Sequence, residues 1–425
     1  MSVHELVLEI ARRVGAAGGR VLLVGGCVRD RLLGIASKDI DLEVYGIPAT
    51  KLREILSGLG EVYDKGAAFS VLALRHYDVD IAMPRRESKS GLRHIDFDVT
   101  VDPYLSYEDA SRRRDFTINA MMLDPLTGEL IDCWHGRNDL ARRVIRHVAD
   151  DTYGDDPLRV FRAAQFAARL EAGIAPETVA ISRGMDVSHL SHERVFDELA
   201  KALMKAKTPS VFFTSLREMA QLSFFFPEME SLMASARRDF ALRALDAAAD
   251  RRGRAMEPLN FMLAALLSAL PDAFPNGEAM ADRQLRRLTN NVRSLRYVKN
   301  MLALRDGPAS LLGKGVFESR VLFDGSVCPR DLMLLAVSRE AASRGADLAS
   351  ALEAFLAARL DDFEARMAQP MVTGQDLIGA GCKPGAQMKL MLDFARKLHF
   401  EGVEREEALK KTLAAFEGEG KRWTD

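Results

Sequence analysis

The chain has 425 residues, of which 48% are hydrophobic and 28% are charged, and its formal net charge is -2. This length exceeds what one hydrophobic core usually organises, so we expect about two to four domains. The composition excludes a largely disordered or fibrous chain. The net charge excludes a strong overall attraction to nucleic acid, so a phosphate-rich partner would have to bind local basic patches.

The cysteines and the apolar runs bear on location and metal content. Four cysteines lie far apart without paired spacing, which predicts neither a zinc site nor a disulfide framework. The N-terminal stretch is amphipathic rather than continuously apolar, and no run is long enough to span a membrane. We therefore expect a cytoplasmic protein without zinc and without membrane association. The pattern leaves the oligomeric state open.

The N-terminal third alternates helical and strand patterns. Residues 3–15 have apolar residues at helical spacing, and a glycine pair ends that helix before the apolar strand VLLVGG. A short helix over VRDRLLG, the strand DIDLEVYG, a helix over 49–59 and the strands SVLALRH and YDVDIAMP follow. This order predicts an α+β unit with several short strands.

The pattern changes twice further along the chain. Residues 85–114 are charged and irregular, which is typical of a mobile functional loop, with a local strand over FDVTV. From Asp156 onward apolar residues recur at spacings of three and four, with glycine and proline between the segments. The remainder is therefore predicted to be a series of helices.

Two aspartate pairs carry candidate chemistry. In a strand, residues i and i+2 point to the same face, so Asp39 and Asp41 would present both carboxylates to one side. Asp78 and Asp80 repeat this spacing in YDVDIA, and a neighbouring strand would bring one of them beside the first pair. Carboxylates so placed suit Mg²⁺ and in-line displacement at phosphorus. The alternative reading is a solvated strand edge.

The segment before the first pair favours the catalytic reading. Gly25 and Gly26 stand between a strand and a helix, where a phosphate can approach backbone N–H groups, and Arg29 lies in the first turn of that helix. The segment matches neither the GxGxxG pattern nor the GxxxxGK[ST] loop. Dinucleotide binding and Walker-type hydrolysis are therefore disfavoured.

Five ordered blocks resemble one family. VGGCVRDRLLGIASKDIDLEVYG is similar to the catalytic signature of the class II tRNA nucleotidyltransferase and bacterial poly(A) polymerase family, among the DNA polymerase β-like nucleotidyltransferases. The blocks VDIAMPRRE, RRDFTINAMMLDPLTGELIDCWHGRNDLARRVIRHV, DDPLRVFRAAQFAARL and HERVFDELAKALM follow in the family's order. The resemblance implies a mixed-sheet catalytic head followed by an all-α neck, body and tail.

The resemblance assigns roles by position. It implies that Asp39 and Asp41 bind the metal, that Asp80 is a third acid, and that Mg²⁺ is the cofactor. The glycine turn at Gly25 and Gly26, together with Arg29, matches nucleotide-phosphate contacts.

Further positions would contact the incoming nucleotide. Arg114 matches a contact to the nucleotide, and Asn119 is a further candidate beside it. Without the following DFTINA, the arginine run would read as a solvated basic turn.

A second set of residues would select the base. Asp156 and Arg159 stand three apart, which places them on one face of a predicted helix with Arg162 one turn further, a spacing usually typical of a surface ion pair. In the family the matching Asp and Arg act as a protein template. Asp only accepts and Arg only donates, so the pair would accept cytosine and adenine and leave uracil and guanine mismatched. One departure is Gln165, where the family often has arginine.

The helical remainder would bind RNA. The resemblance implies four parts: a head at 1–148, a neck at 149–225, a body at 226–365 and a tail at 366–425. The body lacks the histidines of the phosphohydrolase domain that many relatives carry. Basic residues in DRQLRRLTNNVRSLRYVKN read equally as a solvated face or as a phosphate-tracking patch for tRNA.

The resemblance thus implies addition of C and A to the tRNA 3′ end from CTP and ATP, with release of pyrophosphate. The rivals within the enzyme class are an A-only or CC-only adding enzyme and a poly(A) polymerase. KGAAFSVL lacks the Arg-Arg-Phe stretch of related poly(A) polymerases, and residues 85–112 are not shortened as in CC-only relatives. A non-catalytic RNA-binding module is the rival from another class.

Overall fold

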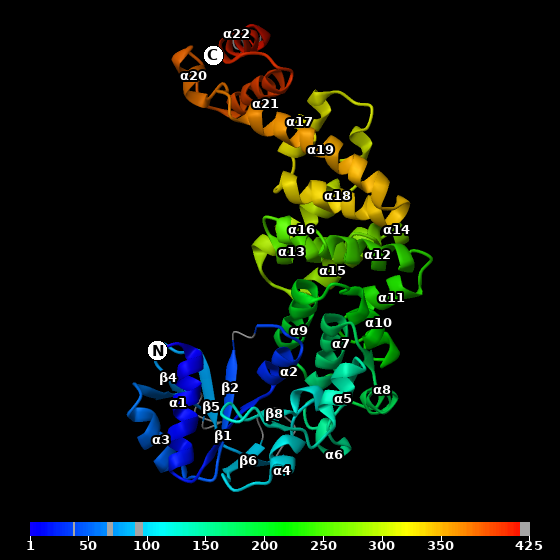
Figure 1. Ribbon diagram of the computed structural model, residues 1–425. Coiled ribbons are helices and arrows are strands. Elements are labelled where there is room, and N and C mark those ends of the chain that lie inside the picture. Colours follow the sequence, from blue (N-terminus) through cyan, green and yellow to red (C-terminus); the bar gives the residue numbers. More distant parts are fainter. Residues whose placement is uncertain (37–38, 66–70, 90–96, 417–425) are drawn as a thin grey trace. The chain divides into compact units, whose positions relative to one another are not determined.

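The computed structural model describes residues 1–36, 39–65, 71–89 and 97–416. The chain divides into two compact units, Met1–Glu230 and Ser231–Asp425. The first unit combines a sheet with helices, and the described part of the second is helical (Figure 1). The predicted α+β head followed by an all-α remainder is confirmed, whereas the finer division at 148, 225 and 365 stays a prediction.

The head is built on a mixed sheet of seven strands with the order β3-β4-β5-β2-β1-β8-β9. The pairing of β2 with β5 is parallel, and the other pairs in this sheet are antiparallel. Strand β2 is hydrogen-bonded on both sides, which holds its side chains in a fixed register. The strands are β1 Arg20–Val24, β2 Ile40–Tyr45, β3 Val62–Asp64, β4 Leu72–Leu74, β5 Val79–Ala82, β8 Met122–Leu123 and β9 Leu130–Ile131.

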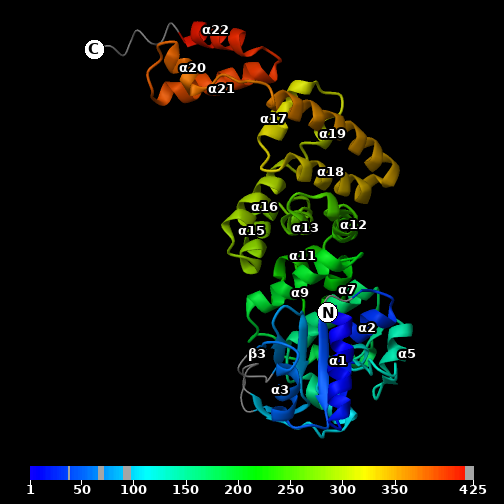
Figure 2. The same cartoon turned by 60° about the vertical axis from the view of Figure 1, so that its left-hand side comes forward.

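Helix α1 (Val3–Ala16) shows why this sequence folds onto the sheet. Its apolar stripe, which includes Leu6, Ile10 and Val14, is buried in the same core cluster as residues of β1, β2 and β5. Ser2 and Glu5 form a capping box that starts the helix. Figure 2 shows α1 running along the strands. The head also contains α2 Gly26–Leu32, α3 Ala49–Ser57, α4 Tyr107–Arg112, the 3₁₀ turn η1 Thr117–Asn119 and α5 Gly136–Ala141.

The stretch predicted to be an irregular loop contains regular structure. The local strand over FDVTV is confirmed as β7 (Phe97–Val101), and it pairs antiparallel with β6 (Arg85–Lys89). Helix α4 follows, capped by the side chain of Ser106. The prediction of an irregular loop was wrong for β6. RRESK has no apolar periodicity that would indicate a strand, and it forms one because it pairs with β7. The central part of the expected loop, 90–96, lies outside the described residues.

The head continues into a helical group within the same unit. Helix α7 contributes the buried residues Val160, Phe161 and Ala164, and it packs against α9 and α10. Helix α7 begins at Leu158, and its N-cap is Pro157. Asp156 therefore lies just before the helix, and the prediction that it lies on this helix was wrong. The elements are β10 Val144–Ile145, α6 Asp150–Tyr153, α7 Leu158–Leu170, β11 Gly173–Ile174, α8 Pro176–Arg183, α9 His192–Lys205 and α10 Ser210–Glu218.

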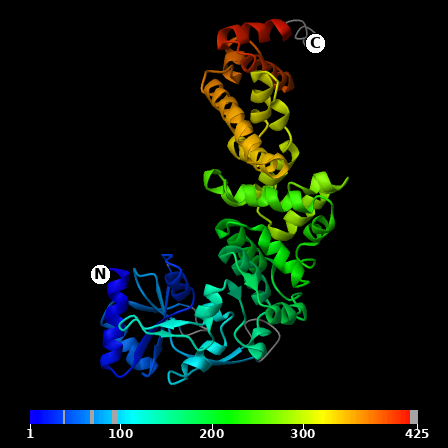
Figure 3. The same cartoon turned by 45° about the vertical axis from the view of Figure 1, so that its right-hand side comes forward.

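The second unit is centred on α13 (Pro258–Leu267), whose residues from Phe261 to Leu267 are all buried. A helix that is apolar all round belongs inside a bundle. Consecutive helices such as α18 and α19 pack on each other (Figure 3). None of the described helices is long and apolar enough to cross a bilayer. The remaining elements are α11 Pro227–Ala234, which contains the unit boundary, α12 Arg238–Ala249, η2 Arg252–Arg254, α14 Leu270–Ala273, α15 Gly277–Leu288, α16 Val292–Leu304, η3 Ala309–Leu311, α17 Val316–Asp324, α18 Pro329–Arg344, α19 Ala346–Met367, α20 Gly374–Gly379, α21 Ala386–Phe400 and α22 Arg405–Phe416.

Candidate active site

A cavity of about 650 Å³ in the first unit gathers most of the predicted site residues. Of the predicted residues, Asp80, Asp156 and Arg159 do not line it. The cavity is lined by Gly25, Gly26, Cys27, Arg29, Asp30, Ile35, Ala36, Asp39, Asp41, Arg114, Asp115, Asn119, Arg162, Gln165, Phe166, Arg169, Glu198, Lys201 and Lys205. Charged groups of both signs dominate this wall, which suits an anionic ligand that arrives with a cation.

The acidic end of the cavity is set by the register of two strands. Asp41 on β2 stands directly opposite Asp80 on the parallel strand β5. Asp39 immediately precedes β2 and is exposed. Burial raises the pKa of Asp41, Arg114 opposes that rise, and the carboxylates of Asp80 and Asp39 add to it. The sheet therefore brings three like charges together, as the spacing in the sequence predicted.

This donor set fits a divalent cation, which would relieve the repulsion between the carboxylates. The fit rests on Asp39 and Asp41, because the carboxylate of Asp80 accepts a hydrogen bond from Lys65 at 2.6 Å. Within the described ranges 1–36, 39–65, 71–89 and 97–416, no group of three or more histidine, cysteine or carboxylate side chains is arranged to hold a metal ion. The metal role of the aspartates stays a prediction.

The glycine turn lies at the same end. Gly25 has a φ of +75°, which favours glycine, and it precedes α2. A Cβ at this position would lie 3.2 Å from Nη1 of Arg114 and 3.5 Å from Oδ2 of Asp41. A side chain here would therefore crowd Arg114 and contact Asp41, and the positive φ of Gly25 would strain any other residue.

Arg29 is more enclosed than its sequence position indicated. Its side chain is 3% exposed, and it donates to Oδ1 of Asp30 through Nε and Nη2 and to Oδ1 of Asn119 at 2.6 Å. The guanidinium also lies over the ring of Phe166, and burial lowers its pKa. Arg29 and Asn119 thus form one buried network at the cavity wall, and their predicted contacts to the nucleotide stay predictions.

Two consecutive arginines and a buried acid form a third group. Glu43, on the same side of β2 as Asp41, is 1% exposed and accepts a hydrogen bond from the Tyr45 hydroxyl at 2.8 Å. Arg113 donates to Glu43 at 3.3 Å, and Nη2 of Arg114 lies 3.7 Å from it. Burial and the neighbouring Glu43 raise the pKa of Tyr45, so its phenol stays protonated and can donate.

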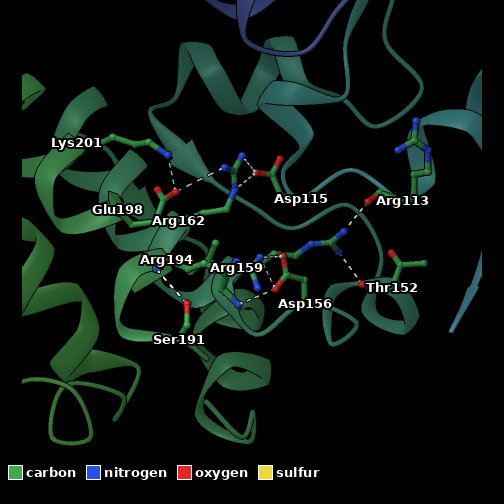
Figure 4. Close-up of polar contacts among 11 residues, drawn as sticks. Arg113, Asp115, Thr152, Asp156, Arg159, Arg162, Ser191, Arg194, Glu198 and Lys201 are labelled. Carbon is green, nitrogen blue, oxygen red and sulfur yellow. Dashed lines mark hydrogen bonds and ion pairs between the residues drawn. The ribbon is translucent and has the colours of Figure 1, made fainter. Parts of the chain in front are cut away.

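The two residues expected to read the base have other partners in the structure (Figure 4). Nη2 of Arg194 donates to both carboxylate oxygens of Asp156, at 2.9 and 3.3 Å. The guanidinium of Arg159 donates to the backbone oxygens of Thr152 and Arg113, each at 2.6 Å. Asp156 is therefore paired with Arg194 and not with Arg159, and the reading as a simple surface ion pair fails.

Arg162 is fixed by a buried acid. It donates through Nε and Nη2 to Oδ2 of Asp115, at 2.8 and 2.5 Å. The charge of Asp115 raises the pKa of Arg162 by more than burial lowers it. Oε1 of Glu198 lies 3.9 Å from Arg162 and accepts a hydrogen bond from Lys201 (Figure 4). Arg162 is therefore held by Asp115, which lies between α4 and η1, and lies close to Glu198 of α9.

Sequence reasoning missed Glu43, Asp115, Arg194 and Glu198. Arg194 and Glu198 are four residues apart on α9, next to the buried Val195 and Leu199. That spacing places both polar side chains on one helix face. This spacing could have predicted that α9 contributes side chains to the site, although it does not predict which residues they contact.

Comparisons with known proteins agree with this geometry. The sequence model of the Poly A polymerase head domain matches residues 21–146. A second model, described as the probable RNA and SrmB-binding site of polymerase A, matches residues 174–233. Residues 21–146 therefore resemble a poly(A) polymerase head domain, and the resemblance to the class II tRNA nucleotidyltransferase and bacterial poly(A) polymerase family is confirmed for the matched regions.

A curated relative and two solved structures are similar to this chain. A multifunctional CCA protein from Aromatoleum aromaticum is 43% identical over 218 residues, which cover 50% of this chain and 52% of the relative. The match thus spans about half the length of that relative. The Thermotoga maritima CCA-adding enzyme complexed with tRNA is 20% identical with a TM-score of 0.68, covering 97% of this chain and 95% of that one. The Bacillus stearothermophilus CCA-adding enzyme in complex with CTP is 22% identical with a TM-score of 0.70, covering 99% and 100%. These structures share the fold.

Proposed function

We propose that this protein adds C and A nucleotides to the 3′ end of tRNA, using CTP and ATP and releasing pyrophosphate. The observation that carries the proposal is the register of Asp41 opposite Asp80 beside a cavity that Arg114 also lines. The printed descriptions of the similar proteins, which name CCA addition, tRNA and CTP, support the choice of substrates.

The reaction joins the 3′ oxygen of the RNA to the α-phosphorus of the nucleotide and breaks the bond to the bridging oxygen of pyrophosphate. Mg²⁺ held by Asp39 and Asp41 would neutralise charge on the phosphates and favour ionisation of the attacking hydroxyl. Arg114, beside the glycine turn, would bind the triphosphate and offset charge on the departing pyrophosphate. Magnesium dependence and a cytoplasmic location stay predictions.

Base selection would follow from the donors and acceptors of two side chains. The carboxylate of Asp156 only accepts, and the guanidinium of Arg159 only donates. Cytosine and adenine each offer an amino group beside a ring acceptor, so either base pairs with both side chains. Uracil and guanine offer a carbonyl and an N–H there, which leaves polar groups unpaired. Because Arg194 and two backbone oxygens hold the pair, it is preorganised for this role.

The second unit would bind the body of the tRNA. On α15 and α16 the buried Leu285, Leu288 and Val298 alternate with exposed basic residues. Arg296 and Lys299 line an open depression of about 450 Å³, together with Asp324, whose charge is paired with Arg396. A backbone phosphate is a suitable occupant for such a basic depression. The exposed basic residues are Arg283, Arg286, Arg287, Arg293, Arg296 and Lys299.

Poly(A) addition is the second candidate, because the matched head domain is described as that of a poly(A) polymerase. One experiment distinguishes it from the A-only and CC-only activities. The purified protein is offered tRNA transcripts that end before the tail, after C and after CC, with CTP and ATP supplied together and one of them labelled at a time. CCA addition predicts growth of every transcript to the same full-length product. A long A tail, or extension that stops after CC, assigns a rival activity.

The catalytic assignment has its own variants. Asp41→Ala should abolish incorporation while the circular dichroism spectrum is unchanged, because the residue lies at the cavity and not in the core. Asp64→Ala is the matched control, since its exposed carboxylate on β3 pairs with Arg53 and does not line the cavity. Near-normal incorporation by Asp41→Ala would overturn this catalytic assignment, whereas RNA binding without Mg²⁺ and without any incorporation by the wild type would favour the non-catalytic RNA-binding reading.

A further inference from the structure

Glu43 is an acid in an apolar setting. It follows the buried Leu42 in β2, pairs in register with Leu22 of β1, and is 1% exposed. A carboxylate in such a place destabilises the fold unless it is paired, and an aliphatic side chain would fill the space at lower cost. The contacts that Glu43 makes must therefore explain why an acid occupies this buried position.

One contact reaches Arg114, whose side chain lines the cavity. Nη2 of Arg114 lies 3.7 Å from Glu43, and Nη1 lies against the turn at Gly25. The Nε of Arg114 is buried and has no hydrogen-bond partner within the described part of the chain. Charge attraction to Glu43, together with that to Asp41, thus orients the guanidinium, while it keeps donors for a ligand in the cavity.

A second contact leads to the base-reading arginine. Nη2 of Arg113 donates to Glu43 at 3.3 Å, and the backbone oxygen of Arg113 accepts from Nη2 of Arg159 at 2.6 Å. Glu43 lies two residues after Asp41 on the same side of β2. Two successive contacts therefore connect the strand of the aspartates to Arg159, which stands on the helix α7.

We propose that Glu43 is a positioning residue for nucleotide selection: it fixes Arg113 and Arg114 against β2 and so holds Arg159 in register with the acidic end of the cavity. This inference rests on the proposed function. It adds that the choice between correct and incorrect bases depends on a buried acid that does not contact the nucleotide.

The test is Glu43→Gln, which keeps the shape and removes the charge. For wild type and variant, kcat and KM are measured for CTP and UTP on a transcript ending before the tail. We expect the ratio of kcat/KM for CTP to that for UTP to fall about tenfold, because a loosened Arg159 rejects uracil less well. KM for CTP should rise as Arg114 loses its anchor. A purely structural role predicts a lower Tm with an unchanged ratio, and that result overturns the proposal.

Two further variants keep the test decisive. Arg113→Gln removes the same contact from the other side, and its effect on the ratio should not add to that of Glu43→Gln in the double variant. Tyr45→Phe removes a neighbouring donor but leaves both arginine contacts, so it should lower Tm and keep the ratio. A wild-type ratio in whichever of the Glu43 and Arg113 variants folds contradicts the proposal. Absence of any nucleotide addition by the wild type instead contradicts the proposed function.

Discussion

Arg194 on α9 holds the carboxylate of Asp156, which precedes α7, with one nitrogen placed 2.9 and 3.3 Å from its two oxygens. The Asp156 carboxylate also accepts a hydrogen bond from the backbone N–H of Leu158 at 3.1 Å. These donors fix the plane of the carboxylate. A residue that reads a base by hydrogen bonds needs this fixed orientation, because its selectivity depends on direction.

Replacement of Arg194 should therefore weaken selectivity. Arg194→Gln is expected to lower kcat/KM for CTP and ATP by about tenfold or more, since a mobile acceptor loses part of its binding energy. The measurement is single-nucleotide incorporation with CTP, ATP and UTP. Arg12→Gln is the matched control, because Arg12 forms an exposed ion pair with Glu9 on α1. Equal kcat/KM values for Arg194→Gln and wild type would show that Asp156 needs no such support.

Asp156 and Arg159 also show how much of the site could be predicted from the sequence. Local spacing placed Asp156 and Arg159 together and predicted the helix that begins at Leu158. The partner of Asp156 comes from α9, and the partners of Arg159 are backbone oxygens of Thr152 and Arg113. Such contacts depend on tertiary packing, and no local periodicity encodes them. The strand register behaves differently, because alternation within β2 and β5 fixes which faces the aspartates share.

Asp115 should contribute strongly to the stability of the first unit. Burial by itself would raise its pKa, but the charge of Arg162, a hydrogen bond from Asn119 and the charge of Arg159 outweigh burial and hold the pKa below its usual value. Asp115→Asn would leave Arg162 without its buried counter-charge. We expect the free energy of unfolding to fall by about 3 kcal/mol. Urea unfolding followed by circular dichroism measures the change.

The lowered pKa of Asp115 also predicts a pH dependence. An acid whose pKa is lower in the folded state stabilises the fold above the pKa of the unfolded chain, and this contribution is lost as the pH falls through the folded pKa. Stability of the wild type should therefore decline with acid more steeply than that of Asp115→Asn. Melting curves from pH 7 down into the acid range compare the two slopes. Parallel slopes would mean that the pKa of Asp115 is the same in the folded and unfolded protein.

Lys65 predicts a modest effect on metal binding. Its ammonium lies 2.6 Å from Asp80, and both side chains are substantially exposed, so the pair itself contributes at most about 1 kcal/mol to stability. Lys65→Met removes a positive charge beside the carboxylates, and we expect Mn²⁺ to bind about two- to threefold more tightly. Titration of free Mn²⁺ by electron paramagnetic resonance measures this. Lys51→Met, which breaks an exposed pair with Glu54 on α3, should leave the affinity unchanged. An unchanged Mn²⁺ affinity in Lys65→Met would show that Asp80 takes no part in binding the ion.

Gln165 allows a gain-of-contact test at the cavity wall. Its side chain is 2% exposed, its Nε2 has no hydrogen-bond partner among the described residues, and it stands beside Phe166 with Arg162 and Arg169 on the same wall. Gln165→Arg adds a buried charge to an already basic group, so Tm without ligand should fall. Bound CTP would supply the counter-charge, so the CTP-induced rise in Tm should exceed that of the wild type. Gln221→Arg is the control: Gln221 is also buried, but it donates to backbone oxygens of Ser182 and Met185 away from the cavity. The Tm of the control variant without ligand should also fall, but its CTP-induced rise in Tm should not exceed that of the wild type. An equal CTP-induced rise in both variants would mean that the triphosphate binds away from Gln165.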